Sequence, residues 1–273
     1  MKRHGNASSA LILLTLLALA VIPLCSWAAD KPKSPDRTGP DPLGALIMPE
    51  LAGGAVLPAG YRGLYEQRFN RPSAMRDFVM TDANAWKLVK DAKVSALVLA
   101  TQSQYKPAVR SPVNIALIAD DVFSDFILEV DLIQTGKEYG HRDMCLFFGF
   151  QSPTNFYYAH IATAADQNAH NVFIVNGAPR TNIARETTQG VKWGLGVWHK
   201  VKLERKVADG SIKIYFDDML KPIMVAEDKT FPSGYVGFGS FDDTGMVDNI
   251  KIWGASLSSK KTEFFSRPAI SEK

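Results

Sequence analysis

Polar side chains of several chemical types surround two short apolar runs in the middle of the chain. The first run begins just after His141 and Arg142, and the second ends with Tyr158 and His160. Imidazole titrates near neutral pH and can serve as a base, and a guanidinium can bind a uronate or sulfate through two parallel hydrogen bonds. Aromatic rings beside such groups suit a sugar better than a nucleotide or a lipid. The sequence therefore predicts a carbohydrate site with these candidates: His141, Arg142, Asp143, Gln151, Tyr158, His160, His170, Asn171 and Arg180.

The same residues also have plainer interpretations. They can tie adjacent strands together or close turns, with Arg142 paired to Asp143. Histidines can ligate zinc, but the chain has no His-x-His or His-x-x-x-His spacing. Cys145 lies inside an apolar run, which is typical of a buried and unreactive thiol.

A second candidate is a pair of carboxylates in an apolar stretch. Glu129 and Asp131 are two residues apart, so on a strand both project from the same face. Residue parity leaves open whether that face lines a groove or is simply an exposed acidic surface.

Acidic residues near the end of the chain are a third candidate. Asp242, Asp243 and Asp248 flank Gly245, and calcium prefers several carboxylate and carbonyl oxygens on irregular backbone. We predict a structural calcium ion here, with solvated turns as the alternative. Gly194-Leu-Gly196 lacks the third glycine of a dinucleotide-binding loop.

The elements that must position these groups are short runs rich in β-branched and aromatic residues, separated by turn residues. Strand-type runs include residues 125–134, 144–151, 156–162 and 198–206, and sustained helical periodicity is missing. On the run 156–162, Phe156, Tyr158 and His160 share one face. Many short strands at regular spacing predict an all-β sandwich or barrel.

The N-terminal 29 residues have the layout of a secretory signal peptide: a basic start, an apolar run and small residues at its end. An uncleaved anchor is the alternative. We expect export to the periplasm or beyond, a Pro/Gly-rich linker or arm over residues 30–60, a single sandwich over 61–254 and a frayed polar tail over 255–273. No second apolar run approaches membrane length, so the mature chain is expected to lack a membrane span.

Charge gives no argument for a polyanionic partner. The formal net charge is +3, and it becomes +1 once Lys2 and Arg3 leave with the signal. A near-neutral chain does not favour nucleic acid or an anionic membrane. Only Cys145 remains after signal removal, so the mature chain cannot form an internal disulfide.

Several runs resemble the strands of concanavalin A-like lectin/glucanase jelly rolls, a superfamily that includes laminin-G-like domains and family 16 glycoside hydrolases. They are residues 126–132, 198–205, 210–218, 234–241 and 247–252, in the family's order. The resemblance implies two antiparallel sheets, one of them concave, and a frequent role in binding or cleaving polysaccharide. The 129–134 run is similar to the catalytic strand of family 16, but Gln134 replaces its third carboxylate, and an amide cannot donate the proton that a retaining glycosidase needs.

The sequence thus predicts an exported jelly-roll protein that binds a polysaccharide or oligosaccharide on its concave sheet. A glycoside hydrolase or polysaccharide lyase on the same surface is the enzymatic alternative. A structural or interaction module of the cell envelope is the third.

Overall fold

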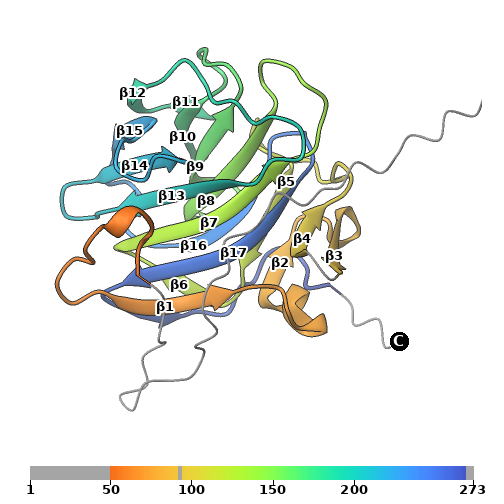
Figure 1. Cartoon of the computed structure of the whole chain (residues 1–273), viewed down its shortest axis with the longest axis horizontal. Helices are drawn as coiled ribbons and strands as arrows, with labels where there is room; N and C mark the ends of the chain where they lie inside the picture. The colour runs from red at the N-terminus through yellow and green to blue at the C-terminus, as the bar shows by residue number, and fades with distance from the viewer. Residues whose placement is uncertain (1–49, 92–93, 269–273) are drawn as a thin grey trace, which may run out of the picture.

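The computed structural model describes residues 50–91 and 94–268, which form two antiparallel sheets packed face to face (Figure 1). Apolar residues alternate along the strands, so each strand presents an apolar face to the other sheet. In spatial order, the larger sheet of the described chain contains β12 (Ala184–Thr187), β15 (Met224–Glu227), β14 (Ser211–Phe216), β13 (His199–Arg205), β7 (Phe126–Gln134), β17 (Gly245–Gly254), β4 (Ser95–Leu99) and β3 (Trp86–Lys90), with β1 (Arg62–Gln67) paired to β17.

The second sheet carries the hairpin that the sequence singled out. Its order is β11 (Thr181–Asn182), β10 (Asn171–Asn176), β9 (Asn155–Ala162), β8 (Asp143–Ser152), β16 (Tyr235–Ser240), β5 (Asn114–Ile118) and β2 (Phe78–Met80). A small ribbon pairs β18 (Leu257–Ser259) with β6 (Asp121–Phe123), and short 3-10 turns lie at Ala52–Gly54, Pro72–Asp77 and Ala83–Ala85. We refer to the two sheets as the β7 sheet and the β8 sheet.

The main core lies between the sheets and follows from strand alternation. On β7, Leu128, Val130 and Leu132 are buried in it, whereas Glu129 and Asp131 point to the opposite face. On β9, Tyr157 and Ala159 belong to the same core. The all-β, two-sheet antiparallel sandwich predicted from the sequence is confirmed.

The outer face of the β8 sheet carries a second apolar cluster, with Phe147, Phe156, Tyr158 and Phe173 among its members. The C-terminal segment covers part of it, because Phe264 and Phe265 pack against this cluster. The backbone of Ser266 also pairs with Met80. The prediction of a frayed tail is therefore wrong up to residue 268. The two phenylalanines bury apolar surface, and that outweighs the polarity of their neighbours.

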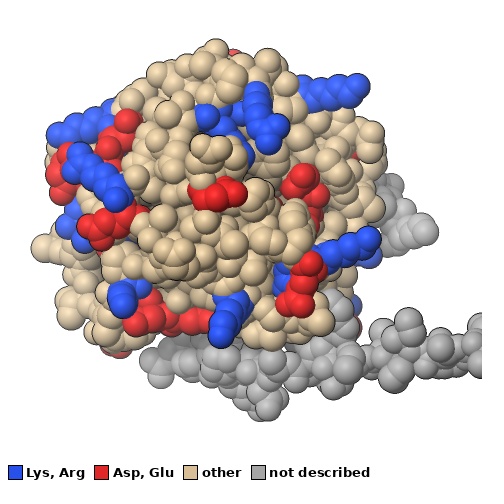
Figure 2. Space-filling view, turned by 90° about the horizontal axis from the view of Figure 1, so that it is seen from above, with Lys and Arg blue, Asp and Glu red and all other residues tan. Residues whose placement is uncertain are grey.

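Charged side chains of both signs are interspersed over the face shown in Figure 2, with no large area of one sign. This distribution agrees with the small net charge of the sequence. Within the described ranges, no helix is long and apolar enough to cross a bilayer. The predicted signal peptide and most of the predicted linker lie outside the described residues.

Candidate functional site

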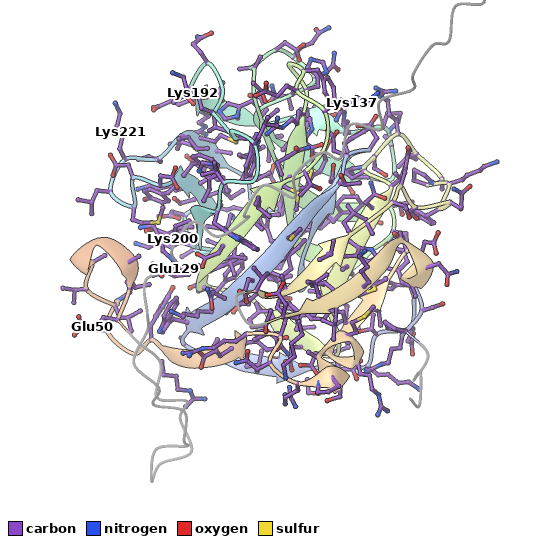
Figure 3. The ribbon with its side chains drawn as sticks, turned by 45° about the vertical axis from the view of Figure 1, so that its right-hand side comes forward. Glu50, Glu129, Lys137, Lys192, Lys200 and Lys221 are labelled. Atoms are coloured by element: carbon purple, nitrogen blue, oxygen red, sulfur yellow. The ribbon has the colours of Figure 1, made fainter. Side chains whose placement is uncertain are left out.

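The paired carboxylates lie on the outer face of the β7 sheet, where Figure 3 shows Glu129 close to Lys200. Glu129 is only 3% exposed and accepts a hydrogen bond from the backbone N–H of Ala52 at 2.8 Å. Burial raises its pKa, although that hydrogen bond and the charge of Lys200 oppose the shift. Asp131 forms an ion pair with Lys200 at 2.9 Å.

The spacing of this strand does not reproduce the family 16 arrangement. Gln134 is buried and, by strand alternation, lies on the face opposite to Glu129 and Asp131. The chain segment over Glu129 also closes the space that a sugar would need. The two carboxylates therefore act in packing and pairing on this face.

Except for Gln151, the carbohydrate-site candidates lie around one end of the β8 sheet, where five loops meet beside β9. The loops precede β5, β8, β10, β11 and β17 in the chain. They enclose a pocket of about 160 Å³ whose lining residues are Arg110, Tyr139, His141, His160, Asn168, Arg180, Phe241 and Asp242.

Arg180 is held in a fixed orientation inside this pocket. Its Nη1 donates to the hydroxyl of Tyr158 at 2.8 Å, and its guanidinium lies over the rings of Phe173 and Phe241. Arg110 lies against the same Phe241 ring at 5.5 Å, and its carbonyl accepts from the N–H of Arg180. Cation–π contacts of this kind stabilise a guanidinium without neutralising its charge.

His141 is exposed at the rim of the pocket, where its Nε2 lies 2.7 Å from Oδ2 of Asp166. The turn that carries Asp166 is fixed by Asn171, whose amide donates to the carbonyls of Asp166 and Ala169. Asn171 thus supports the pocket wall and does not line it. A carboxylate at this distance orients the imidazole.

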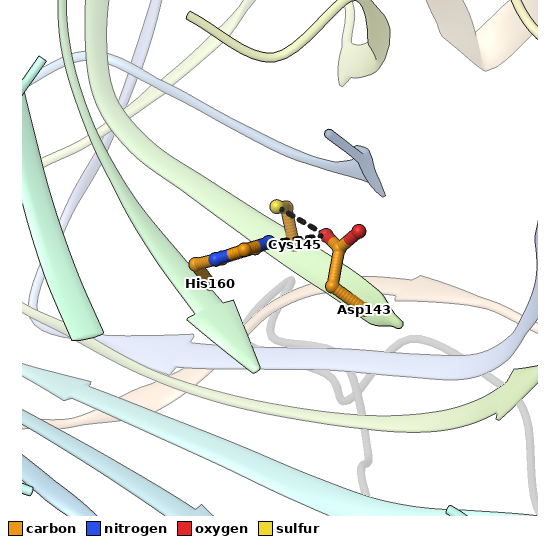
Figure 4. Close-up of side chains that lie close together, drawn as sticks. All are labelled: Asp143, Cys145 and His160. Atoms are coloured by element: carbon orange, nitrogen blue, oxygen red, sulfur yellow. Dashed lines mark hydrogen bonds and ion pairs between the residues drawn. The ribbon is translucent and has the colours of Figure 1, made fainter. Parts of the chain in front are cut away.

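His160 lies at the floor of the pocket and is 3% exposed. Its Nε2 is 3.3 Å from Oδ2 of the fully buried Asp143, as Figure 4 shows. Burial favours the neutral acid, but the His160 charge and hydrogen bonds from His160, Cys145 and Ser240 keep the pKa of Asp143 below its usual value. Asp143 is therefore an ionised group beneath the pocket.

Besides Asp143 and Asn171, four sequence candidates do not line the pocket. Arg142 is 1% exposed and donates to the carbonyl of Gly194, because its chain turns inward and fastens that loop. Gln151 lies at the far end of β8 and donates to the carbonyl of Ser233. The buried His170 accepts from the N–H of Ala162 and contacts the hydroxyl of Thr188. Tyr158 is buried beneath Arg180 and supports its side chain.

The acidic residues proposed for calcium separate into two places. Asp248 lies on β17 directly across from Asp131, on the outer face of the β7 sheet. Asp242 and Asp243 instead face Asp143, and the three carboxylates lie within 4.8 Å of one another. Burial, with a contribution from Asp143, raises the pKa of Asp243 to about 6, although the hydrogen bond from Tyr139 opposes the shift. The calcium set predicted from sequence is thus corrected by exchanging Asp248 for Asp143, and calcium binding itself stays a prediction.

Sequence reasoning missed Arg110, Tyr139, Asn168 and Phe241, and it assigned Asp242 only to a metal. All five are loop residues, and loop positions carry no periodicity that predicts where a side chain points. Tyr139 had one usable signal, because it lies two residues before His141 in the same polar loop.

Known proteins resemble this chain in fold. No protein-family model matches it, and the search of curated proteins finds no match. Similar solved structures include the carbohydrate-binding module CBM66 from Bacillus subtilis, with 20% identity, a TM-score of 0.45, and coverage of 68% of this chain and 97% of that chain. Winged bean acidic lectin complexed with methyl-α-D-galactose has 12% identity and a TM-score of 0.45. The match covers 72% of this chain and 99% of that chain.

A glycosyl hydrolase-like protein from Parabacteroides distasonis gives 11% identity, a TM-score of 0.46, and coverage of 69% of this chain and 98% of that chain. These similarities concern the sandwich and transfer no ligand. The sheet order itself shows a two-sheet antiparallel jelly-roll sandwich, and the solved structures similar to it have concanavalin A-like, lectin-type folds.

Proposed function

We propose that this protein binds carbohydrate, and that the pocket at the end of the β8 sheet receives a sugar residue bearing a uronate or sulfate group. One observation carries the proposal. Arg110 and Arg180 enter the same pocket, and neither has an ion-pair partner among the described carboxylates. Two guanidinium groups without such a partner attract an anion, and each can bind it through two parallel hydrogen bonds.

The remaining lining groups suit a polyhydroxylated ligand. Asn168 and His141 can donate and accept hydrogen bonds, and the carboxylate of Asp242 accepts them. The pocket volume of about 160 Å³ is below the roughly 300–1,000 Å³ of pockets for drug-sized ligands. We infer that one sugar residue, at the end or on a branch of a chain, enters the pocket.

A polysaccharide lyase is the second candidate, and the His141–Asp166 contact favours it. The imidazole is accessible, is oriented by a carboxylate, and lies in the same pocket as two guanidinium groups that can neutralise a uronate. A lyase needs such a base and such a neutralising group. Binding without turnover needs only the guanidinium groups, so it requires less of the site.

Export is part of the proposal, and the N-terminal sequence pattern supports it. Fractionation of cells that express the full chain tests it directly. Recovery of the protein only from the cytoplasm, with its first residues retained, would contradict export.

A glycan array that contains matched acidic and neutral oligosaccharides tests the binding function. We expect retention of uronate- or sulfate-bearing members, and an affinity about 10- to 100-fold lower for Arg180→Ala. Arg185→Ala is the matched control, because Arg185 is an exposed arginine paired with Glu227 outside the pocket. The absence of binding to every glycan on the array would contradict the proposal. The remaining alternative would then be an interaction module of the cell envelope. Release of unsaturated or reducing ends, measured in parallel, would favour the enzyme.

A further inference from the structure

Three side chains of metal-ligating type converge on the outer face of the β8 sheet (Figure 4), and one of them, His160, lines the pocket. Asp143 and Cys145 are two residues apart on β8, so both project from the same face. His160 is the direct cross-strand partner of Cys145 on β9. The strand pairing itself therefore fixes the relative positions of the three groups.

The cluster is buried and its hydrogen bonding is incomplete. Asp143 and Cys145 are 0% exposed and His160 is 3% exposed. Nε2 of His160 is paired with the carboxylate of Asp143, whereas its Nδ1 has no hydrogen-bond partner within the described chain. A buried polar group without a partner destabilises a fold, so such a group indicates an unrecorded ligand or a functional role. The imidazole faces the two groups that could share a ligand with it.

The distances within the cluster suit tetrahedral coordination. Oδ2 of Asp143 is 3.0 Å from Sγ of Cys145 and 3.3 Å from Nε2 of His160. A tetrahedral zinc ion with ordinary bond lengths separates such ligand atoms by roughly 3.4–3.6 Å. The third separation, between Sγ of Cys145 and the ligating nitrogen of His160, is within 4.8 Å, so side-chain shifts would accommodate an ion.

The surroundings of Asp143 complete the geometry of a metal centre. Its other oxygen, Oδ1, accepts from the hydroxyl of Ser240 at 2.8 Å, which orients the carboxylate. Oδ2 accepts from the backbone N–H of Phe241 at 3.0 Å and is the oxygen that faces Cys145 and His160. Groups that hold the ligands in this way raise metal affinity in many proteins. His160 also borders the pocket, so a water molecule or a ligand oxygen can supply a fourth donor.

We propose that Asp143, Cys145 and His160 bind a thiophilic divalent transition metal of the zinc class. Sulfur, nitrogen and one carboxylate oxygen form a donor set that zinc accepts and that calcium and magnesium do not favour. Binding displaces the proton of the Cys145 thiol into solvent, so affinity falls as the pH is lowered. The metal then replaces a thiol–carboxylate hydrogen bond.

Titration of the purified, metal-stripped full chain with zinc chloride tests the proposal. We expect one zinc per chain, and a rise in melting temperature of about 5–10 °C when free zinc is about one hundred times Kd. Cobalt chloride should give the charge-transfer absorption of a cobalt–thiolate bond. Calcium chloride should not bind to the cluster of Asp143, Cys145 and His160. Any rise in melting temperature that calcium causes would therefore come from another site.

Cys145→Ser and His160→Gln should each lower zinc affinity at least tenfold, and Cys145→Ser should abolish the cobalt–thiolate band. Ser240→Ala should lower affinity by roughly 10- to 100-fold, since it releases the carboxylate of Asp143 and removes the acceptor of the Asp243 N–H. His141→Gln is the matched control and should retain zinc, because this pocket histidine is outside the cluster. Circular dichroism of each variant identifies any that fails to fold.

Two outcomes would overturn the proposal. One is the absence of stoichiometric zinc or cobalt binding by the folded wild-type protein. The other is zinc binding that Cys145→Ser leaves intact but Asp242→Asn removes, which would place the ion at the carboxylates of Asp143, Asp242 and Asp243. The glycan proposal rests on Arg110 and Arg180, which belong to no part of the metal cluster, and the glycan array tests it separately. Because His160 and Asp242 also line the pocket, glycan binding is measured for their variants as well.

Discussion

The guanidinium of Arg180 lies 4.4 Å from the centroid of the Phe241 ring, although the two residues belong to different loops. Tyr158 fixes the same guanidinium from below by accepting a hydrogen bond at 2.8 Å. A charged group held by a ring and a hydroxyl loses little conformational entropy when a ligand binds. This preorganisation gives the pocket an anion-binding group whose position is set before binding.

Arg180→Lys tests whether that geometry matters beyond charge. The ammonium keeps the positive charge but loses the planar fork and the ring contacts, so affinity for an acidic glycan should fall about tenfold or more. Calorimetric titration measures the effect, with Arg185→Lys as control. Equal affinity of Arg180→Lys and wild type would show that the pocket attracts its ligand by charge alone.

His170 should make folding stability depend on pH. Burial, with a smaller contribution from the charge of His160, lowers the pKa of His170 to about 4, below its ordinary value near 6.5. The unfolded chain therefore takes up a proton more readily between pH 6.5 and 4, and stability falls as the pH drops through that window. Between pH 7 and pH 5 the loss due to this group is about 2 kcal/mol.

His170→Asn removes the titrating group and suits the positive φ of this position. The difference in unfolding free energy between pH 7 and pH 5, measured in urea, should be smaller in the variant by that amount. An identical pH dependence in the two proteins would contradict the assignment.

Gly190→Ala should destabilise the fold strongly. The backbone φ at Gly190 is +127°, and an added Cβ would lie 2.0 Å from the carbonyl oxygen of Thr163. Strain and overlap together should cost about 2–4 kcal/mol. Gly54→Ala is the matched control, since its φ is +70° but the added Cβ meets nothing within 4 Å. Thermal unfolding should show a clearly larger loss at Gly190; equal losses would be inconsistent with the overlap.

Phe264→Ala tests the C-terminal cover of the β8 sheet. The ring of Phe264 lies 5.5 Å from those of Phe150 and Tyr235, so its removal should cost about 1–3 kcal/mol. Val56→Ala, at a position that is 91% exposed, should change stability by less than about 0.5 kcal/mol. Chemical denaturation compares the two; a neutral Phe264→Ala would mean that the segment is not stably docked.

Glu129→Gln separates packing from catalysis on the β7 sheet. The amide oxygen can still accept the hydrogen bond from Ala52, so the variant should fold and bind glycan like the wild type. Any release of sugar ends by the wild type should persist in the variant. Loss of such activity on this single substitution would restore a catalytic role to Glu129.

The strand pattern follows from the order of apolar and polar residues. Alternation along residues 126–134 and 156–162 set which side chains enter the core, since a strand projects successive residues to opposite faces. The resemblance to jelly rolls added the expectation of two antiparallel sheets. The common face of Tyr158 and His160 followed from the same parity.

Which of these groups reach solvent depends on how the folded chain packs. It turned Arg142 inward to Gly194, covered Tyr158 with Arg180, and brought Arg110 and Phe241 from distant loops to one pocket. Periodicity describes a strand, but a pocket formed by five loops depends on long-range packing that a local pattern does not encode. The contact of His160 and Cys145 likewise depends on strand register, which the pairing of β8 with β9 fixes.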